Sequence, residues 1–555
     1  MAPCATLGII YQMIVTNSAP RIVLATLNAK YIHASLGLRC LLANMDKHGR
    51  PGLRRQTLLR EYVIAQKPVH IAEDLLALNP EVIGLGVYIW NAVPTLQLLR
   101  LLKALRPDIK LVLGGPEVSH ELDQQELTRL ADHVITGWGD VSFPKLCRAL
   151  LDGPAPLMKV IVGEQPPLDE LALPYAEYSD PDLAQRLLYV EASRGCPFKC
   201  EFCLSALDKT AWAFELDRFM DELAQLHARG ARHFKFVDRT FNLRLEHSMR
   251  ILQFFLDHMR TPEGTLPEHS DLFVHFEVVP DNLPDRLKAL IAQFPAGSLQ
   301  FEVGIQSFNP EVQQRISRQQ DNDKTADNLR WLVSQSRAHV HADLIFGLPG
   351  ETLDSFAQGF DRLVGLGPHE IQLGILKRLR GAPIARHTQA FAMVFDPEPP
   401  YSILQNSTVS FVTVQHMQRL ARYWDLVANS GRFAQSLQLL LAGPSAFAAF
   451  MQWTVWLWQT TGKTHEFAHE KLVDLLFEHL TAVRGLDAEV VRQALWLDYL
   501  ASGARAKPRC LAALLESPPQ AAHAGQVTAA PRAERQARHA QQTLREQIQQ
   551  AAAAA

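Results

Sequence analysis

The feature that most constrains the fold is a regular alternation of short apolar runs and helical stretches between residues 187 and 377. Six runs rich in branched and aromatic residues recur there, roughly 30–45 residues apart. This spacing is typical of βα units. Six units predict a partial (β/α)6 barrel over residues 186–385, with its chemistry at the carboxyl ends of the strands. The runs are LLYVEAS (187–193), HFKFVDR (233–239), LFVHFEVV (272–279), LQFEVGIQS (299–307), HVHADLIFGL (339–348) and EIQLGILK (370–377).

A second α/β pattern precedes the first, over residues 20–150. Its apolar runs are short and branched, as in strands that are buried on both faces of a parallel sheet. The pattern predicts a doubly wound, Rossmann-like domain. The four runs are RIVLATL (21–27), VIGLGVYI (82–89), KLVLGG (110–115) and HVITGW (133–138). Glycines 114, 115, 137 and 139 lie at or just after the ends of the last two runs. Two interpretations stay open: the glycines let a ligand approach the backbone, or they only form tight turns.

The remaining segments differ in composition. Residues 1–19 form an N-terminal extension whose apolar part, 7–16, is either an extra edge strand or an over-long start upstream of Met13. Residues 151–185 are rich in proline and are interpreted as a linker. Helical patterns dominate residues 386–510. Residues 511–555 are rich in alanine and glutamine, and we expect this tail to be disordered or at most a frayed helix.

Charge and hydrophobicity exclude several classes of protein. With 55 basic and 58 acidic residues, the net charge of −3 argues against a protein that coats nucleic acid, although it does not exclude RNA as a substrate. No charge occurs between Arg432 and Lys463, but Gly443 and Pro444 break this run into halves too short to span a bilayer. We therefore expect two core helices, no membrane partner and, without an evident secretory signal, a cytoplasmic protein.

Three of the seven cysteines lie close together, directly after the first strand of the barrel. Cys196, Cys200 and Cys203 occur in the segment GCPFKCEFC, where Gly195 and Pro197 predict a loop rather than a helix. A structural zinc site needs a fourth ligand, and the other cysteines are scattered along the chain. Thiolates suit iron–sulfur clusters, and three of them leave one iron of a four-iron cluster open. An iron–sulfur cluster is therefore favoured over zinc.

This C-x3-C-x2-C loop after the first barrel strand resembles the radical S-adenosylmethionine (SAM) superfamily. The resemblance implies a [4Fe-4S] cluster on the three cysteines and SAM bound to the open iron. It also implies an electron donor such as flavodoxin or ferredoxin, and an enzyme that cleaves SAM to a 5′-deoxyadenosyl radical. Phe202, just before the last cysteine, matches the family's aromatic residue near the SAM adenine.

Further motifs at successive strand ends extend the resemblance. VDRTFN (237–242) stands where the family usually has a glycine-rich motif for the SAM amino group, and the usual Gly-Gly-Glu is absent. FEVGIQS (301–307) resembles the fourth-strand motif, with Glu302 a candidate for the ribose hydroxyls. Arg318 is a candidate for the SAM carboxylate. DLIFGLPGE (343–351) resembles the segment whose backbone meets adenine. The residues implied to bind SAM are Phe202, Asp238, Thr240, Glu302, Gln306, Ser307, Arg318, Ile345 and Gly347.

The order of domains narrows the resemblance to one subgroup. Its members carry an N-terminal cobalamin-binding-type domain and a helical C-terminal domain of unknown function. Gly114, Gly115, Gly137 and Gly139 would then lie against cobalamin. The Asp-x-His-x-x-Gly motif that supplies an axial histidine in several cobalamin proteins is missing, and His33 has the wrong spacing to Gly37. We therefore interpret His33 as a loop or capping residue.

The leading hypothesis is a radical SAM enzyme, plausibly a cobalamin-dependent methyltransferase acting on a small molecule or another unidentified substrate. One alternative is a different radical SAM reaction, such as sulfur insertion or rearrangement, with a non-cobalamin first domain. Another is a non-catalytic cobalamin or metabolite sensor, although a sensor does not need the three-cysteine loop.

Overall fold

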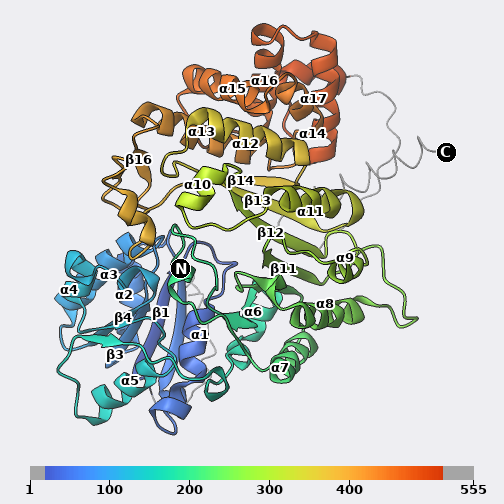
Figure 1. Ribbon diagram of the computed structural model, residues 1–555. Coiled ribbons are helices and arrows are strands. Elements are labelled where there is room, and N and C mark those ends of the chain that lie inside the picture. The colour runs from blue at the N-terminus through green and yellow to red at the C-terminus, as the bar shows by residue number, and fades with distance from the viewer. Residues whose placement is uncertain (1–18, 517–555) are drawn as a thin grey trace, which may run out of the picture. The chain divides into compact units, whose positions relative to one another are not determined.

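A computed structural model describes residues 19–516 (Figure 1). These residues form two compact units, the first ending at Tyr178 and the second beginning at Ser179. The apolar run expected at 7–16 and the tail from residue 517 onward lie outside the described residues. The first residues of the predicted tail, 511–516, are helical: Leu511 ends η11 (Arg509–Leu511), and α18 (Ala512–Glu516) follows.

The first unit is a six-stranded parallel sheet in the order β2-β1-β3-β4-β5-β6. Two core clusters cover its two faces: α2, α3 and α4 pack on one side, and α1 and α5 on the other. The predicted doubly wound architecture is therefore confirmed. The strands are β1 (Ile22–Asn28), β2 (Thr57–Val63), β3 (Val82–Gly86), β4 (Lys110–Gly114), β5 (His133–Thr136) and β6 (Val160–Val162).

The helical segments of the first unit connect its strands or follow the last of them. They are α1 (Leu36–Ala43), η1 (Met45–Gly49), η2 (Arg54–Gln56), α2 (Pro68–Ala77), α3 (Ala92–Leu105), η3 (Pro116–Val118), η4 (Leu122–Gln124), α4 (Glu126–Leu130), α5 (Ser142–Asp152), η5 (Leu168–Glu170) and η6 (Tyr175–Glu177). The proline-rich segment 151–185 contributes more than a connection, because its strand β6 pairs with β5 and extends the sheet.

The second unit begins with a parallel sheet in the order β14-β13-β12-β11-β10-β7. Each long strand lies beside the next one along the chain, as in a (β/α) barrel, so the six predicted strands are all present. The strands are β7 (Leu188–Val190), β10 (His233–Phe236), β11 (Phe273–Val278), β12 (Leu299–Gln306), β13 (His339–Phe346) and β14 (Glu370–Ile375). A small hairpin of β8 (Ser193–Arg194) and β9 (Trp212–Ala213) flanks the cysteine loop.

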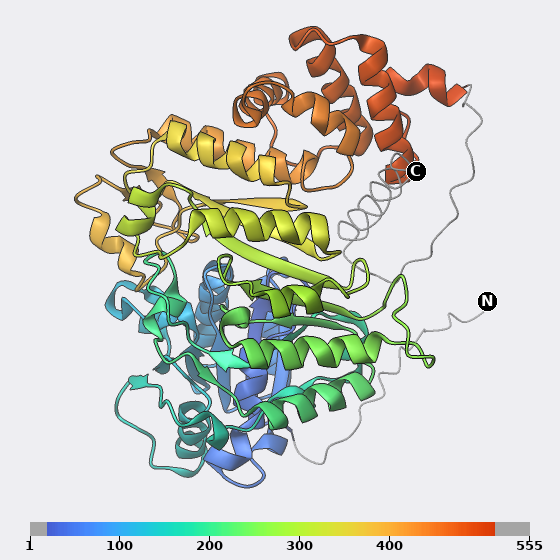
Figure 2. The same cartoon turned by 45° about the vertical axis from the view of Figure 1, so that its right-hand side comes forward.

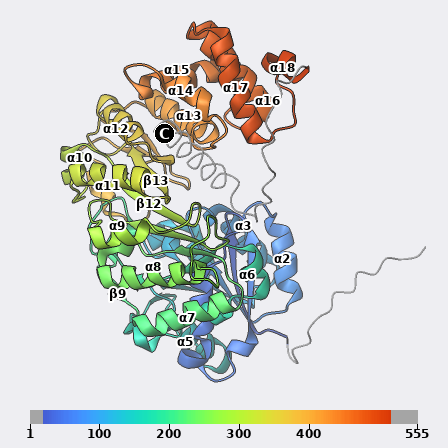
Figure 3. The ribbon, with the colours of Figure 1, turned by 90° about the vertical axis from the view of Figure 1, so that its right-hand side faces the viewer.

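Helices follow the strands of this sheet and lie along its outer face (Figure 3). Fully buried phenylalanines, among them Phe236 and Phe276 with ring centroids 4.5 Å apart, fill the space beneath them. The helical segments are α6 (Asp180–Gln185), η7 (Leu204–Leu207), α7 (Leu216–Ala228), η8 (Phe241–Leu243), α8 (Leu245–Met259), α9 (Asp285–Ile291), α10 (Pro310–Arg315), α11 (Asn322–Gln335), α12 (Leu353–Leu366) and η9 (Pro383–His387).

A helical layer follows, after the short antiparallel pair β15 (Val394–Phe395) and β16 (Ile403–Gln405). Figure 2 shows its orange and red helices gathered at one end of the second unit. The layer consists of α13 (Phe411–Val427), α14 (Ala434–Leu441), α15 (Ala446–Thr461), α16 (His469–Glu478), the π-helix η10 (His479–Val483) and α17 (Ala488–Ser502). The charge-free run thus forms the two predicted helices, α14 and α15. Among residues 19–516, no helix is long and apolar enough to cross a bilayer.

The helical layer is joined to the sheet by specific contacts. Asn429 donates to the carbonyl of Ile371 and accepts from its N–H, both at 2.9 Å, so its amide pairs with the edge strand β14 as another strand would. The backbone N–H of Phe447 donates to Asp361 of α12 at 2.7 Å. The ring of Trp424 packs edge-on against Phe360, with centroids 4.8 Å apart.

Candidate functional site

A cavity opens at the carboxyl ends of the strands β7 to β13, as the barrel pattern predicts. It contains about 960 Å³ of space free of protein atoms, counted to the solvent at its mouth. All three clustered cysteines line it, together with residues from the ends of four other strands. Of the residues expected to bind SAM, the lining includes Phe202, Thr240, Glu302, Gln306 and Arg318.

The cysteine loop depends on a glycine at its start. Gly195 has φ +83°, and a Cβ there would lie 2.8 Å from the backbone nitrogen of Ala211 and 2.9 Å from the carbonyl oxygen of Asp208. The same carbonyl accepts a hydrogen bond from the N–H of Cys196 at 2.9 Å. The loop is therefore fixed by close backbone approach rather than by helical structure.

Glu201, between the second and third cysteines, connects the cysteine loop to two other segments of the second unit. Its buried carboxylate accepts hydrogen bonds from Ser317 at 2.6 Å and His387 at 2.8 Å, and it also pairs with Arg386. Its N–H donates to the carbonyl of Ile316 at 3.0 Å. These contacts connect the cysteine loop to the segments that follow β12 and β14. The role of Glu201 was not predicted, because the spacing of the cysteines says nothing about the residues between them.

The three thiols fit an iron–sulfur cluster better than a single metal ion. Within residues 19–516, no group of three histidine, cysteine or acidic side chains converges closely enough to hold one ion. A four-iron cluster does not need such convergence, because each thiolate binds a different iron. Cys196, Cys200 and Cys203 form no disulfide bonds and are half-buried. Burial raises the pKa of Cys196 and Cys200, so irons that displace their protons would also relieve unfavourable desolvation of the thiolates.

Arg318 contacts the cysteine loop directly. Its Nη1 donates to the Sγ of Cys200 at 3.6 Å, and its Nε and Nη2 donate to Gln320 at 3.0 and 2.8 Å. Nη2 also bonds the carbonyl oxygen of Gly304. Gln306 lies beside it in the left-handed region, with φ +70°, where the pairing of β12 with β13 shifts register. Such bulges are frequent next to active sites, because they redirect side chains.

Glu302 lies deeper, among polar side chains that point into the barrel. Its carboxylate lies 3.1 Å from Nζ of Lys235 and 3.3 Å from Nε2 of His275. Burial raises the pKa of Glu302, but the close imidazole of His275 and the charge of Lys235 outweigh this effect and lower the pKa overall. Glu302 is therefore an ionised, already paired acceptor in the wall of the cavity.

Asp281 and two acidic residues of the strands line the cavity but were not among the predicted site residues. Asp343 of β13 and Glu277 of β11 line it beside Glu302. Burial raises the pKa of Asp343 well above its ordinary range, and the charges of Glu302 and Glu277 raise it further. Asp343 thus favours its protonated form, which can donate a hydrogen bond. The inward positions of alternate residues along β11 and β13 were the signal that could have identified both.

Four predicted residues do not belong to the wall of this cavity. The carboxylate of Asp238 is turned toward β7, where it accepts from the N–H of Ala192 at 2.9 Å and the hydroxyl of Ser193 at 2.5 Å. Ser307 donates to Glu351 at 2.5 Å. Neither these two residues nor Ile345 and Gly347 are among the residues that line the cavity.

In the first unit, the predicted glycines have different physical roles. Gly115 has φ +108°, and a Cβ there would lie 2.4 Å from the carbonyl oxygen of Val87, so the turn itself requires glycine. A Cβ on Gly139 would meet Leu41 at 2.9 Å, whereas one on Gly114 meets only a backbone oxygen at 3.7 Å. Gly137 has φ +72° and open space around the position of a Cβ, which leaves room for a ligand at this edge.

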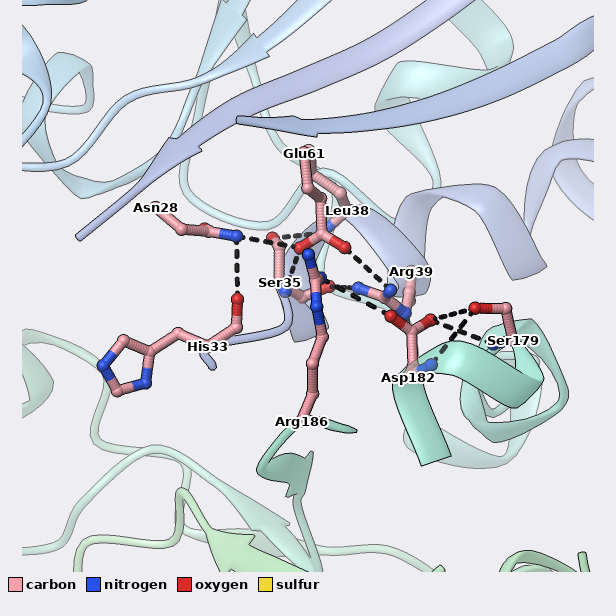
Figure 4. A network of polar contacts seen from close by, with 9 residues as sticks. All are labelled: Asn28, His33, Ser35, Leu38, Arg39, Glu61, Ser179, Asp182 and Arg186. Atoms are coloured by element: carbon pink, nitrogen blue, oxygen red, sulfur yellow. Dashed lines mark hydrogen bonds and ion pairs between the residues drawn. The ribbon is translucent and has the colours of Figure 1, made fainter. Parts of the chain in front are cut away.

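A buried ion pair fixes the loop that follows β1 in the first unit (Figure 4). Glu61 of β2 pairs with Arg39 of α1 at 2.8 Å, and their side chains are 7% and 2% exposed. The same carboxylate accepts from the side chain of Asn28 at 3.0 Å and the N–H of Ser35 at 2.5 Å. His33 lies in this loop, and its imidazole points away from Glu61 in Figure 4.

Three models of known protein families match the chain. The model of the radical SAM superfamily matches residues 190–363, and the model of the B12 binding domain matches residues 22–147. The third model, of a family described as a protein of unknown function (DUF4080), matches residues 389–554. The cysteine loop and the strands β7 to β13 fall within the first match.

Individual proteins are similar to parts of this chain or to most of its fold. A cobalamin-dependent radical SAM methyltransferase, TokK from Streptomyces tokunonensis, is 27% identical over 57% of this chain and 50% of its own length. The uncharacterized methyltransferase PH0819 from Pyrococcus horikoshii is 25% identical over 51% of this chain and 63% of its own length. The chain thus spans half to just under two thirds of these relatives. The structure of the cobalamin-dependent SAM radical enzyme OxsB with aqua-cobalamin bound is also similar, and the match covers 90% of this chain and 83% of that one. With a TM-score of 0.57 and 12% sequence identity, this similarity is one of fold.

Proposed function

Because the chain belongs to the radical SAM superfamily, in the subgroup with an N-terminal B12-binding domain and a C-terminal domain of unknown function, we propose that it is a cobalamin-dependent methyltransferase. It cleaves SAM at a [4Fe-4S] cluster and transfers a methyl group to a small-molecule substrate. We propose residues 20–150, 186–385 and 386–510 as the three domains. An external one-electron donor such as flavodoxin or ferredoxin completes the reaction.

One observation carries this proposal: Cys196, Cys200 and Cys203 share a cavity at the carboxyl edge of the parallel sheet. That edge is where barrel enzymes place their chemistry. A four-iron cluster on three thiolates supplies low-potential electrons and one open iron for SAM, and cobalamin supplies a methyl carrier.

The residues around the cysteines have distinct proposed roles. Glu201 holds the loop in position through Ser317 and His387. Arg318, bonded to Cys200 and Gly304, lies where it can meet the carboxylate of SAM. A protonated Asp343 donates to a ligand oxygen, while Glu302, paired with Lys235, accepts from a hydroxyl.

The experiment that tests the proposal uses the full chain, reconstituted anaerobically with iron, sulfide and hydroxocobalamin. SAM labelled with ¹⁴C in its methyl group and a one-electron reductant are then added. We expect labelled methylcobalamin bound to the protein, together with 5′-deoxyadenosine. Failure to bind hydroxocobalamin at micromolar concentration, with 5′-deoxyadenosine still formed, would overturn the methyl-transfer part and leave a different radical SAM reaction.

A further inference from the structure

Arg239 is a cation in the cavity that no role above uses. It follows β10 by three residues and lines the same cavity as the three cysteines. Its Nη1 donates to both carboxylate oxygens of Glu277, at 2.8 and 2.9 Å. Its side chain is nonetheless 51% exposed, whereas that of Glu277 is only 17% exposed. The guanidinium is therefore fixed at one nitrogen and open to the cavity elsewhere.

The two arginines of the cavity differ in how many of their donors are used. In Arg318 all three guanidinium nitrogens have partners, namely Gln320, Cys200 and the carbonyl of Gly304. In Arg239 a single nitrogen makes both bonds to Glu277. Its Nε and Nη2 donate to no other residue in the described part of the chain. These two nitrogens form the edge of the guanidinium that pairs with a carboxylate through two parallel hydrogen bonds.

The neighbouring charges favour a carboxylate over a phosphate. Glu277 and Asp281 line the same cavity as Arg239, and their charges would repel a ligand with two negative charges more strongly than a ligand with one. Arg239 already shares its charge with Glu277, so a monoanion with two coplanar oxygens fits the remaining edge better than a tetrahedral dianion. An uncharged ligand would leave a charged donor pair without a matching acceptor.

We propose that the Nε and Nη2 edge of Arg239 binds a carboxylate group of the substrate. This inference rests on the proposed function, because it places that carboxylate in the cavity that also holds the cluster cysteines. The substrate is accordingly a carboxylic acid or a peptide chain end rather than a neutral or purely phosphorylated compound. The carboxylate of SAM is the other possible source of the same chemistry, and the experiment separates the two.

The test measures the chemical modification of individual arginines by phenylglyoxal in the reconstituted wild-type protein. Propionate is the carboxylate probe, propionamide its uncharged match and inorganic phosphate the competing anion, each at 100 mM and constant ionic strength. Arg286, which is 64% exposed and pairs with Glu246 on the surface, is the internal control. Mass spectrometry of the digested protein gives the rate at each residue, with and without saturating SAM.

We expect propionate to slow the modification of Arg239 at least fivefold relative to propionamide, in the presence of SAM. The rate at Arg286 should change by less than 1.5-fold, and SAM alone should change the rate at Arg239 by less than twofold. Equal rates with propionate and propionamide would overturn the carboxylate site. Protection by SAM alone would assign Arg239 to the cofactor, and stronger protection by phosphate would overturn the class of ligand. Because the readout needs no turnover, it remains valid if the methyl-transfer proposal fails.

Discussion

At the scale of single residues, neighbouring acids of one cavity differ in charge because their partners differ. Glu302 has Lys235 and His275 within 3.3 Å, and these contacts keep it ionised. Within residues 19–516, Asp343 makes no ion pair with a lysine or arginine, and its basic partner is His341, at 3.4 Å. Its pKa is raised first by burial and then by the charges of Glu302 and Glu277, which favours the protonated acid. One cavity wall thus offers both an anionic acceptor and a neutral donor.

This difference predicts unequal effects of two isosteric substitutions. Glu302→Gln leaves Lys235 without its counter-charge and should lower the free energy of unfolding by about 2 kcal/mol. This loss is smaller than the loss expected for a fully buried ion pair, because the side chain of Glu302 is 22% exposed. Asp343→Asn replaces a neutral acid by a neutral amide and should cost less than about 0.5 kcal/mol at pH 7. Urea denaturation measures both variants. Equal losses would contradict the assigned charge states.

Asp238 gives a prediction that depends on pH. Burial raises the pKa of Asp238 from 3.8 to about 7, against the opposing hydrogen bonds from Ser193 and Ala192. The folded chain therefore binds more protons than the unfolded chain between about pH 4 and 7, and this contribution to stability is lost as the pH rises through that window. Asp238→Asn has no such proton, so its stability relative to the wild type should increase from pH 5 to pH 8. Parallel stability curves for the two proteins would contradict this assignment.

Residue types and spacing identified the cysteines and part of the cavity wall. Cys196, Cys200 and Cys203 were predictable because three thiols within eight residues have few uses other than metal. Glu277 and Arg239 were not, because a carboxylate and a guanidinium are common at surfaces and only the register of β10 and β11 brings them together. The orientation of Asp238 toward Ser193 could not be predicted either, because the motif locates the residue but not its χ angles.

At the scale of elements, the cysteine loop depends on backbone geometry that only glycine allows. Gly195→Ala should disrupt the loop, since φ is +83° and the new Cβ would meet backbone atoms within 3 Å. Gly264→Ala is the matched control, with φ +80° but no atom within 4 Å of the Cβ, so it carries only the backbone strain of about 1–2 kcal/mol. We expect iron content after reconstitution to fall several-fold in the first variant and to change little in the second.

A similar iron content in the two glycine variants would show that backbone crowding does not determine the cluster loop. Near-ultraviolet circular dichroism of each variant before reconstitution checks that the second unit has folded. A loss confined to Gly195→Ala then reports on the loop rather than on the whole unit.

The contact between the helical layer and the sheet gives another prediction. Asn429→Ala removes both hydrogen bonds to the backbone of Ile371 and should destabilise the unit by about 1–3 kcal/mol, because these edge groups are buried. Gln372→Ala, at an exposed position of the same strand, should change stability by less than about 0.5 kcal/mol. Hydrogen exchange should accelerate at the Ile371 amide in the first variant only. Unchanged exchange there would contradict the role of Asn429 as a cap of the edge strand.

In the two six-stranded sheets, most strands could be predicted and two could not, for physical reasons. The buried strands of the first sheet are continuous apolar runs, and those of the second are rich in branched and aromatic residues, so the sequence displays both directly. Strand β2 lies at a sheet edge, and its run TLLREYV contains Arg60 and Glu61, whose charges hide the strand. Strand β6 has three residues, all at least partly exposed, at the opposite edge of the same sheet. Edge strands have one neighbour and need less apolar surface.

At the scale of the whole molecule, the chain combines two parallel α/β sheets with a helical layer packed on the second. The first sheet has a glycine-rich carboxyl edge with space beside Gly137. The second has the three cysteines at its carboxyl edge. The cavity at this edge also contains Arg239, which we propose binds a carboxylate of the substrate.

The proposed function requires that Cys196, Cys200 and Cys203 hold an iron–sulfur cluster that cleaves SAM. The most direct measurement is the amount of 5′-deoxyadenosine formed by the anaerobically reconstituted protein with SAM and dithionite. We predict at least one equivalent per chain for the wild type and for Cys510→Ala, because Cys510, whose backbone N–H donates to Asp474, lies far along the chain from the cysteine loop. We predict none for the variant with Cys196, Cys200 and Cys203 all replaced by alanine. Comparable 5′-deoxyadenosine from the triple variant would contradict the account.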